Sequence, residues 1–165
     1  MGKTVFVTVG TTSFDALTEK VSSKTICEKL QKLGYTSVSL QIGRGEYEPE
    51  PVKTPDFELS FFRYKDSISK DIQSADLVIS HAGAGSVLET MEANKPMIVV
   101  INELLMGNHQ IELAYQLYKD GHLLYATPST LGDLLDNLDI SKLKPFPRGE
   151  PEKFATFLDE TVGYR

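Results

Sequence analysis

The sequence predicts an α/β protein built on a Rossmann-like parallel sheet with helices on both faces. Two observations support this fold class. The strand candidates are apolar throughout, as in Leu77-Val78-Ile79, which indicates burial on both faces of a sheet. Segments with helical spacing of apolar residues alternate with these strands, as in repeated β-α-β units. Ligands of such sheets bind outside the carboxyl ends of the strands.

Six strands are expected, each a run of β-branched or apolar residues bounded by turn residues. The first ends at Gly10-Thr11-Thr12-Ser13, a turn with residues suited to cap a helix. Residues 43–55 are rich in Gly, Pro and Glu and are expected to form an exposed excursion. In order, the strands cover residues 4–9, 37–42, 57–62, the run that begins at Leu77, 97–101 and 123–126.

The helices between these strands follow from apolar residues spaced three and four apart. The first pattern allows an interruption at Ser22-Ser23 and ends at Gly34, a residue suited to a helix C-terminus. The last helix carries an apolar stripe of Phe154, Phe157, Leu158 and Val162 after a linker rich in proline. In order, the helices cover residues 14–33, 68–72, 85–94, 108–120, 131–138 and a stretch within 151–165.

The 165 residues are expected to form one domain over 1–150, followed by an amphipathic C-terminal helix over 151–165. The composition, 41% hydrophobic and 24% charged, is typical of a soluble globular protein. The net charge of -6 argues against nucleic acid as a partner, because the protein's own field would repel it. No apolar run approaches the roughly 18 residues of a membrane span, so direct membrane insertion is not expected.

The most informative motif is the turn His81-Ala82-Gly83-Ala84-Gly85-Ser86 between a strand and a helix. Small residues let a ligand approach the main chain, and free N–H groups at a helix start attract phosphate oxygens. A carboxylate at Glu89 can accept two hydrogen bonds from a ribose diol. The unit is therefore expected to hold a nucleotide diphosphate.

Two residues of this motif allow a structural interpretation as well. The segment Ser86-Val87-Leu88-Glu89 matches a capping box, in which Glu89 would accept from the main chain at the start of the helix. His81 could be a residue of the core edge instead of a part of the diphosphate site. Likewise, Asn108 in the run Asn108-His109-Gln110 could simply cap a helix, although neighbouring amide and imidazole groups also suit the hydroxyls of a sugar.

Several other site classes do not fit the sequence. Leu88 stands where the dinucleotide fingerprint requires its third glycine, which disfavours a nicotinamide cofactor. Neither the phosphate-loop motif nor the nucleophile-elbow motif is present. No cluster of His, Cys and carboxylates has metal-ligand spacing, and no Asp-x-Asp pair occurs, so no metal cofactor is expected.

Taken together, the motifs resemble those of a known family. They look like those of the donor-binding subunits of the two-part UDP-N-acetylglucosamine transferases of the dolichol pathway. These subunits are similar to the C-terminal half of MurG, a GT-B glycosyltransferase. The resemblance of this chain to them covers nearly its whole length. The residues that carry it are, in order, Gly10-Thr11-Thr12, Gln41-Ile42-Gly43-Arg44-Gly45, the run from Ala75 to Ser86, Glu89, Lys95-Pro96 and Asn108-His109-Gln110.

The resemblance implies an inverting transfer of N-acetylglucosamine from UDP-N-acetylglucosamine to dolichol-diphosphate-N-acetylglucosamine. This is the second step of lipid-linked oligosaccharide synthesis for N-glycosylation. It implies a heterodimer, in which a membrane-anchored subunit supplies the acceptor lobe and recruits this cytoplasmic chain to the cytosolic face of the endoplasmic reticulum. A nucleotide-sugar-binding paralogue or regulator without turnover is the alternative.

The resemblance also implies roles for individual residues. Glu89 would bind the ribose, His109 and Gln110 the N-acetylglucosamine, and Tyr64 and Lys65 the uracil through their main chain. The general base would lie on the partner subunit, and the C-terminal helix would contribute to the interface with it. The implied substrate-binding set is Gly10, Thr11, Thr12, Tyr64, Lys65, His81, Ala82, Gly83, Ala84, Gly85, Ser86, Glu89, Asn108, His109 and Gln110.

Overall fold

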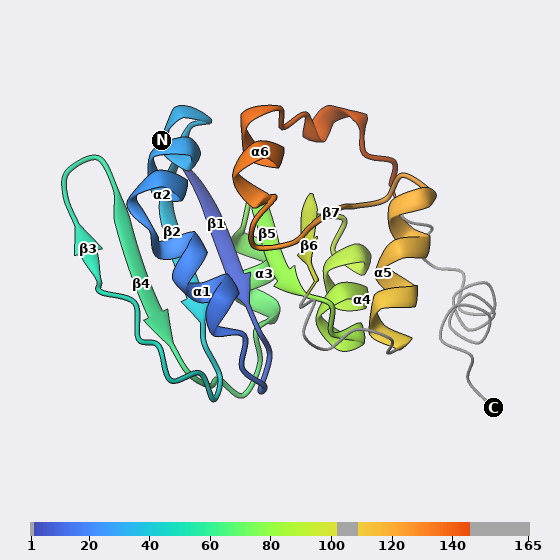
Figure 1. The fold of residues 1–165 in the computed structure, drawn as a ribbon, viewed down its shortest axis with the longest axis horizontal. Helices are drawn as coiled ribbons and strands as arrows, with labels where there is room; N and C mark the ends of the chain where they lie inside the picture. Colours follow the sequence, from blue (N-terminus) through green and yellow to red (C-terminus); the bar gives the residue numbers. More distant parts are fainter. Residues whose placement is uncertain (1, 102–108, 146–165) are drawn as a thin grey trace.

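The computed structural model describes residues 2–101 and 109–145, and these form a largely parallel sheet between two layers of helices (Figure 1). The predicted fold class is therefore confirmed. The strands are β1 (Lys3–Thr8), β2 (Tyr35–Gln41), β3 (Val52–Lys53), β4 (Glu58–Phe62), β5 (Leu77–His81), β6 (Met97–Val100) and β7 (Leu124–Ala126). Their order is β3-β4-β2-β1-β5-β6-β7, and every neighbouring pair is parallel except β3 with β4.

The described helices alternate with the strands as expected. They are α1 (Asp15–Ser22), α2 (Lys24–Lys32), α3 (Ser69–Ser74), α4 (Ala84–Glu92), α5 (His109–Lys119) and α6 (Leu131–Asp136), followed by the 3-10 turn η2 (Ile140–Lys142). The interruption expected at Ser22-Ser23 is confirmed, because Ser23 is extended and separates α1 from α2. Its hydroxyl accepts from the N–H of Ile26 and so caps α2.

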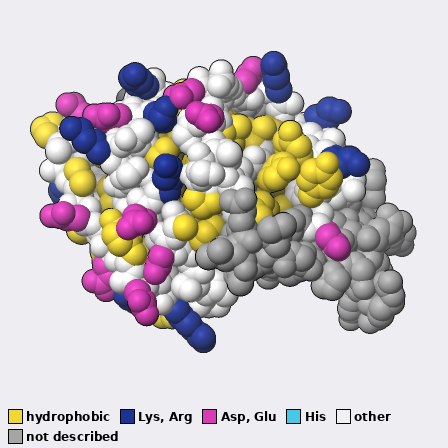
Figure 2. All heavy atoms as spheres, in the orientation of Figure 1, with side chains coloured by type: hydrophobic (Ala, Val, Ile, Leu, Met, Phe, Trp, Pro, Cys, Tyr) yellow, Lys and Arg dark blue, Asp and Glu magenta, His cyan; other side chains and the backbone are white. Residues whose placement is uncertain are grey.

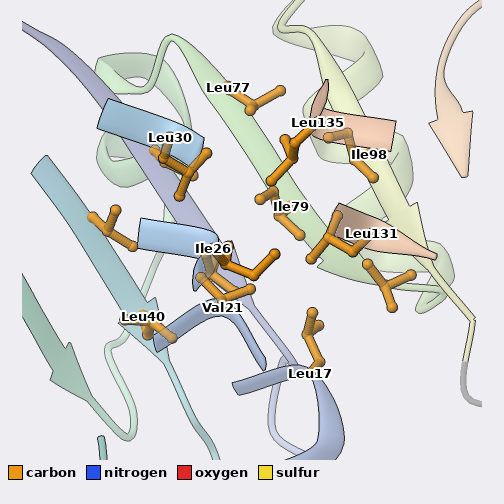
Figure 3. Close-up of a cluster of buried hydrophobic side chains, with 14 of the residues drawn as sticks. Leu17, Val21, Ile26, Leu30, Leu40, Leu77, Ile79, Ile98, Leu131 and Leu135 are labelled. Carbon is orange, nitrogen blue, oxygen red and sulfur yellow. The ribbon is translucent and has the colours of Figure 1, made fainter. Parts of the chain in front are cut away.

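The two faces of the sheet are covered by different helices. Alternate strand residues point to opposite faces, so Val5 and Val7 of β1 belong to one buried cluster and Phe6 to the other. Helices α1, α2 and α6 cover the first face, and α3, α4 and α5 cover the second. Figure 3 shows the first cluster, in which Leu17, Val21, Ile26, Leu30, Leu131 and Leu135 of the helices meet Leu40, Leu77, Ile79 and Ile98 of the strands.

One strand, β3, and the 3-10 turn η2 were not predicted. The excursion over 43–55 contains the edge strand β3, whose Val52 and Lys53 pair antiparallel with Leu59 and Glu58. Two residues are too few to give a period-2 pattern in a sequence, so no signal marked them. The same excursion was expected to be exposed, but Gly43 and Gly45 are buried.

The surface of the described part carries charges of both signs. On the face shown in Figure 2, lysine and arginine side chains are interspersed with acidic ones and form no continuous basic region on the described residues. Within residues 2–101 and 109–145, no helix is both long and apolar enough to cross a membrane. The helix expected within 151–165, and with it the boundary at residue 150, lies outside the described residues.

The order in which the strands are added reverses at β1, in the centre of the sheet. From β1 the chain adds β2 and β4 on one side, then crosses to the other side to add β5, β6 and β7. The register pairs Thr8 with both Gln41 and Ser80, so the carboxyl ends of β1, β2 and β5 lie at one edge. In sheets of this kind, such a switch point is where ligands bind.

Candidate functional site

The first turn of α4 is open at the switch point. β5 ends at His81, and α4 begins two residues after Ala82, with Gly83 in the N-cap position. Gly83 has no side chain that could cap this helix start. A β-carbon on Gly85 would meet no heavy atom of the described residues within 4 Å, so this part of the structure leaves open space beside it. The first turn of α4 therefore has both main-chain donors and room for an anion such as a phosphate.

His81 joins the two glycine loops that flank the switch point. A β-carbon on Gly10 would lie 3.1 Å from Cε1 of His81, and one on Gly83 would overlap the same ring. Gly10 also has a positive φ of 65°, a conformation that L side chains rarely adopt. Burial lowers the pKa of His81 from 6.5, although a hydrogen bond with the Thr8 main chain acts in the opposite direction. His81 therefore packs between the two loops, as the structural interpretation expects, and its lowered pKa favours the neutral imidazole.

A buried polar network supports the loop after β1. Thr8 Oγ1 donates to Gln41 Oε1 at 2.6 Å and accepts from the N–H of Gly10 at 2.9 Å. Thr8 and Gln41 are buried, so the network lies in a region where unpaired polar groups would be costly. The hydroxyl of Thr12 donates to the Val9 carbonyl at 2.8 Å. These hydrogen bonds hold the main chain of the turn Gly10-Thr11-Thr12 in place, while Thr11 and Thr12 stay exposed.

The turn Gly43-Arg44-Gly45 packs directly on this loop. A β-carbon on Gly43 would overlap the carbonyl of Thr12, and its φ of 55° also favours glycine. The N–H of Arg44 donates to that carbonyl at 2.9 Å, while the Arg44 side chain is exposed. Arg63 Nη1 donates to the carbonyls of Gly43 and Gly45 at 3.0 and 2.8 Å. The two glycines therefore serve close packing of the main chain at the switch point.

Glu89 lies one turn beyond Gly85 on the same face of α4, about 6 Å along the helix axis. Its half-buried carboxylate accepts a hydrogen bond from Ser69 Oγ of α3 at 2.6 Å. The capping-box interpretation is wrong, because α4 begins at Ala84 and Ser86 already lies inside the helix. Glu89 instead lines a pocket of about 350 Å³ between α3 and α4, together with Ser69, Ile72, Gln73, Glu92 and Ala93.

Tyr64 and Lys65 follow β4 at the same edge of the sheet. Tyr64 is 53% exposed. The ammonium of Lys65 pairs with Asp71 of α3 at 2.9 Å and lies 4.2 Å from the ring centroid of Phe62. The Lys65 side chain is thus engaged with α3 and β4, while 46% of it stays exposed.

The third expected loop is described only in part. His109 and Gln110 open α5, which follows β6, the neighbour of β5 in the sheet. Figure 1 shows the starts of α4 and α5 at the same edge of the sheet. Asn108 lies outside the described residues, as does most of the loop before it. A second pocket, of about 170 Å³ and lined by Asn94, Lys95, Pro96, His122 and Lys144 among others, lies at the opposite edge, before β6.

The sequence did not identify the residues that support the site through hydrogen bonds to its loops and to Glu89. Thr8 and Gln41 were polar residues inside apolar strands, a signal that could have marked a buried network. Ser69 carried no local signal, because its partner Glu89 lies 20 residues away. In the described part of the chain, no three His, Cys, Asp or Glu side chains converge to hold a metal ion.

Comparison with known proteins identifies the family. Residues 4–161 match the family described as the glycosyltransferase family 28 C-terminal domain. The chain belongs to this family. The family resemblance read from the motifs is thereby confirmed.

Individual relatives agree with this assignment. The human UDP-N-acetylglucosamine transferase subunit ALG13 is 62% identical over 125 residues, which are 76% of this chain and 11% of the human protein. The chain thus spans about a tenth of that relative. A solution structure of ALG13 superposes with a TM-score of 0.74 at 29% identity and covers 98% of both chains. MurG of Acinetobacter baumannii has the same fold over 99% of this chain and 46% of its own, with a TM-score of 0.64 and 17% identity.

Proposed function

We propose that this chain is the donor-binding subunit of an inverting UDP-N-acetylglucosamine transferase, a hexosyltransferase. It transfers N-acetylglucosamine from UDP-N-acetylglucosamine to dolichol-diphosphate-N-acetylglucosamine in the synthesis of lipid-linked oligosaccharide. The observation that carries the proposal is the open start of α4 at the switch point, with Glu89 one turn further along the same helix face. The names of the relatives supply the identity of the donor.

In this proposal the donor lies across the carboxyl ends of β1, β5 and β6. The diphosphate lies at the first turn of α4, between residues 82–86 and the loop Gly10-Thr11-Thr12. The ribose hydroxyls donate to Glu89, and the uracil lies along the main chain of Tyr64 and Lys65. The sugar lies toward Asn108-His109-Gln110. One helix terminus contributes only about 0.3–1 kcal/mol, so several main-chain amides must share the charge, and no metal is assigned.

The reaction requires a second subunit. An acceptor hydroxyl oxygen attacks the anomeric carbon of the donor, the bond to the UDP oxygen breaks, and the hydroxyl proton passes to a general base. This chain matches 46% of the length of MurG, which supports its being one lobe of a larger fold. We assign the acceptor lobe and the base to a membrane-anchored partner, and we name no catalytic residue in this chain. The partner recruits the chain from the cytoplasm to the cytosolic face of the endoplasmic reticulum.

The test is transferase activity with UDP-N-acetylglucosamine and a short dolichol-like diphosphate-N-acetylglucosamine acceptor. It is measured for this chain alone and for the chain co-expressed with the partner subunit. We expect activity only when this chain and the partner subunit are present together. A complex that forms but remains inactive would overturn the enzyme assignment and favour the alternative, a regulator that binds nucleotide sugar without turnover.

A further inference from the structure

Ser69 connects two helices at the edge of the pocket between α3 and α4. It is the first residue of α3, and its hydroxyl donates to Oε2 of Glu89 on α4 at 2.6 Å. Both side chains are half-buried. A hydrogen bond to a charged carboxylate in such surroundings is stronger than one between neutral groups. The contact therefore restricts the Glu89 carboxylate to one position.

The hydroxyl of Ser69 is itself held in place. Ser67 Oγ donates to Ser69 Oγ at 3.1 Å, and the N–H of Ser69 donates back to Ser67 Oγ at 3.1 Å. With its oxygen accepting from Ser67, the Ser69 hydroxyl directs its own proton toward Glu89. On the other side of this turn, the ion pair between Lys65 and Asp71 ties the loop after β4 to α3. The first turn of α3 thus links that loop to Glu89.

A fixed carboxylate suits the recognition of a diol. An ionised carboxylate offers about four lone-pair positions on its two oxygens, and Ser69 uses one of them on Oε2. The remaining positions can accept both O–H groups of a ribose. A free glutamate side chain would lose rotamer freedom when it bound, and this loss would weaken binding. Ser69 removes that loss before the ligand arrives.

We propose that Ser69 is a positioning residue that orients Glu89 for the ribose diol of the nucleotide. This inference rests on the proposed function, because it requires a nucleotide at α4. It predicts that Ser69 matters only for ligands that carry the diol, whereas a purely structural serine would affect every nucleotide equally.

The experiment is a chemical-shift titration of the full 165-residue chain with UDP and with 2′,3′-dideoxy-UDP. We expect Ser69→Ala to weaken UDP binding about 5- to 20-fold, less than the loss of a direct hydrogen bond to a charged group, because Ser69 acts through Glu89. Ser69→Thr keeps the hydroxyl and should bind UDP as the wild type does. Ser69→Ala should not change the affinity for the dideoxy compound, and it should add no further loss in a Glu89→Ala background.

Controls separate the possible failures. Ser74→Ala, at the exposed end of the same helix, should leave both affinities unchanged, and Ser69→Gly is a second variant without the hydroxyl. If wild-type protein binds UDP and Ser69→Ala binds it equally well, the inference is wrong while the proposed function stands. An equal loss for both ligands would also overturn it. If the wild type does not bind UDP, the proposed function is wrong, and this inference is wrong as well because it depends on that function.

Discussion

The imidazole of His81 lies where a side chain on Gly83 would have to be. A β-carbon on Gly83 would overlap Nε2 and Cε1 of the ring, and a β-carbon on Gly10 would lie 3.1 Å from the same Cε1. The Cε1–Nε2 edge of the ring therefore lies against the main chain of both loops. This contact sets the distance between the loop after β1 and the start of α4, and so the width of the proposed diphosphate site.

Gly83→Ala should destabilise the protein for this reason. Forcing a methyl group into a packed contact costs about 1–3 kcal/mol, since the imidazole or the main chain must shift. The free energy of unfolding, measured with urea, should fall by that amount. An unchanged unfolding midpoint would mean that His81 can leave the contact freely.

Gly85→Ala is the matched control two residues along the same helix. Because a β-carbon at Gly85 meets open space, its stability should be unchanged or up to about 1 kcal/mol higher, as expected for alanine in place of glycine in a helix. UDP affinity, however, should fall severalfold, because the methyl group occupies the space where the diphosphate approaches. Full affinity for UDP in this variant would argue against the start of α4 as the diphosphate site.

The stability of the fold should depend on the protonation of His81. Burial depresses its pKa in the folded state below the ordinary 6.5, so the unfolded chain binds a proton more readily. The stabilisation is complete above about pH 6.5 and is lost as the pH falls through the folded-state pKa. Urea unfolding between pH 5 and pH 8 should therefore show a loss of stability toward acid that His81→Gln lacks.

The size of this pH dependence can be stated, and a second histidine provides a control. The difference in slope between wild type and His81→Gln should correspond to the uptake of at most one proton on unfolding. His122→Gln serves for comparison, because His122 lies at the far edge, where its Nδ1 is 3.1 Å from the Lys144 carbonyl. It removes an imidazole without touching the contact between His81 and the two glycine loops. Equal slopes for wild type and His81→Gln would show that the protonation of His81 is not coupled to folding.

Periodic elements could be predicted from the sequence, and contacts between them could not. The alternation of apolar strands and amphipathic helices gave the parallel sheet, and Ser22-Ser23 marked a real break between α1 and α2. The start of α4 was ambiguous in the sequence, because Ser86 and Glu89 fit a capping-box pattern. In the structure Gly83 takes the N-cap position instead. Local patterns of this kind are decided by tertiary contacts, here by the bond from Ser69 to Glu89.

Burial of the glycine turn was missed for a related reason. Gly43 and Gly45 lie in a polar, proline-containing segment, which is typical of an exposed loop. The structure buries them because the absence of side chains lets their main chain contact Thr12 and Asp15. The motif residues at the switch point could thus be predicted individually, while the way in which they support one another required the coordinates.

Removal of residues 151–165 should abolish complex formation with the membrane-anchored partner. The prediction rests on the sequence, because the apolar stripe of Phe154, Phe157, Leu158 and Val162 is expected to contribute to that interface. Within the described residues, the clusters on both faces of the sheet are already extensively buried, so we expect the truncated chain to keep its fold. Co-purification measures the complex, and circular dichroism measures the fold. Phe157→Asp should reproduce the loss and Thr156→Asp should not; normal recovery of the truncated chain with its partner would refute the prediction.

Thr8→Val should damage both stability and donor binding, because it removes the centre of the network below the loop after β1. The change leaves the Gln41 carbonyl without its 2.6 Å donor and the Gly10 N–H without its 2.9 Å acceptor. Loss of partners for buried polar groups costs about 1–3 kcal/mol, which urea unfolding should detect. UDP affinity should fall as well, since Gly10-Thr11-Thr12 loses its support. Thr8→Ser retains the hydroxyl and should preserve UDP affinity, so equal affinities of the valine and serine variants would show that the network does not position this loop.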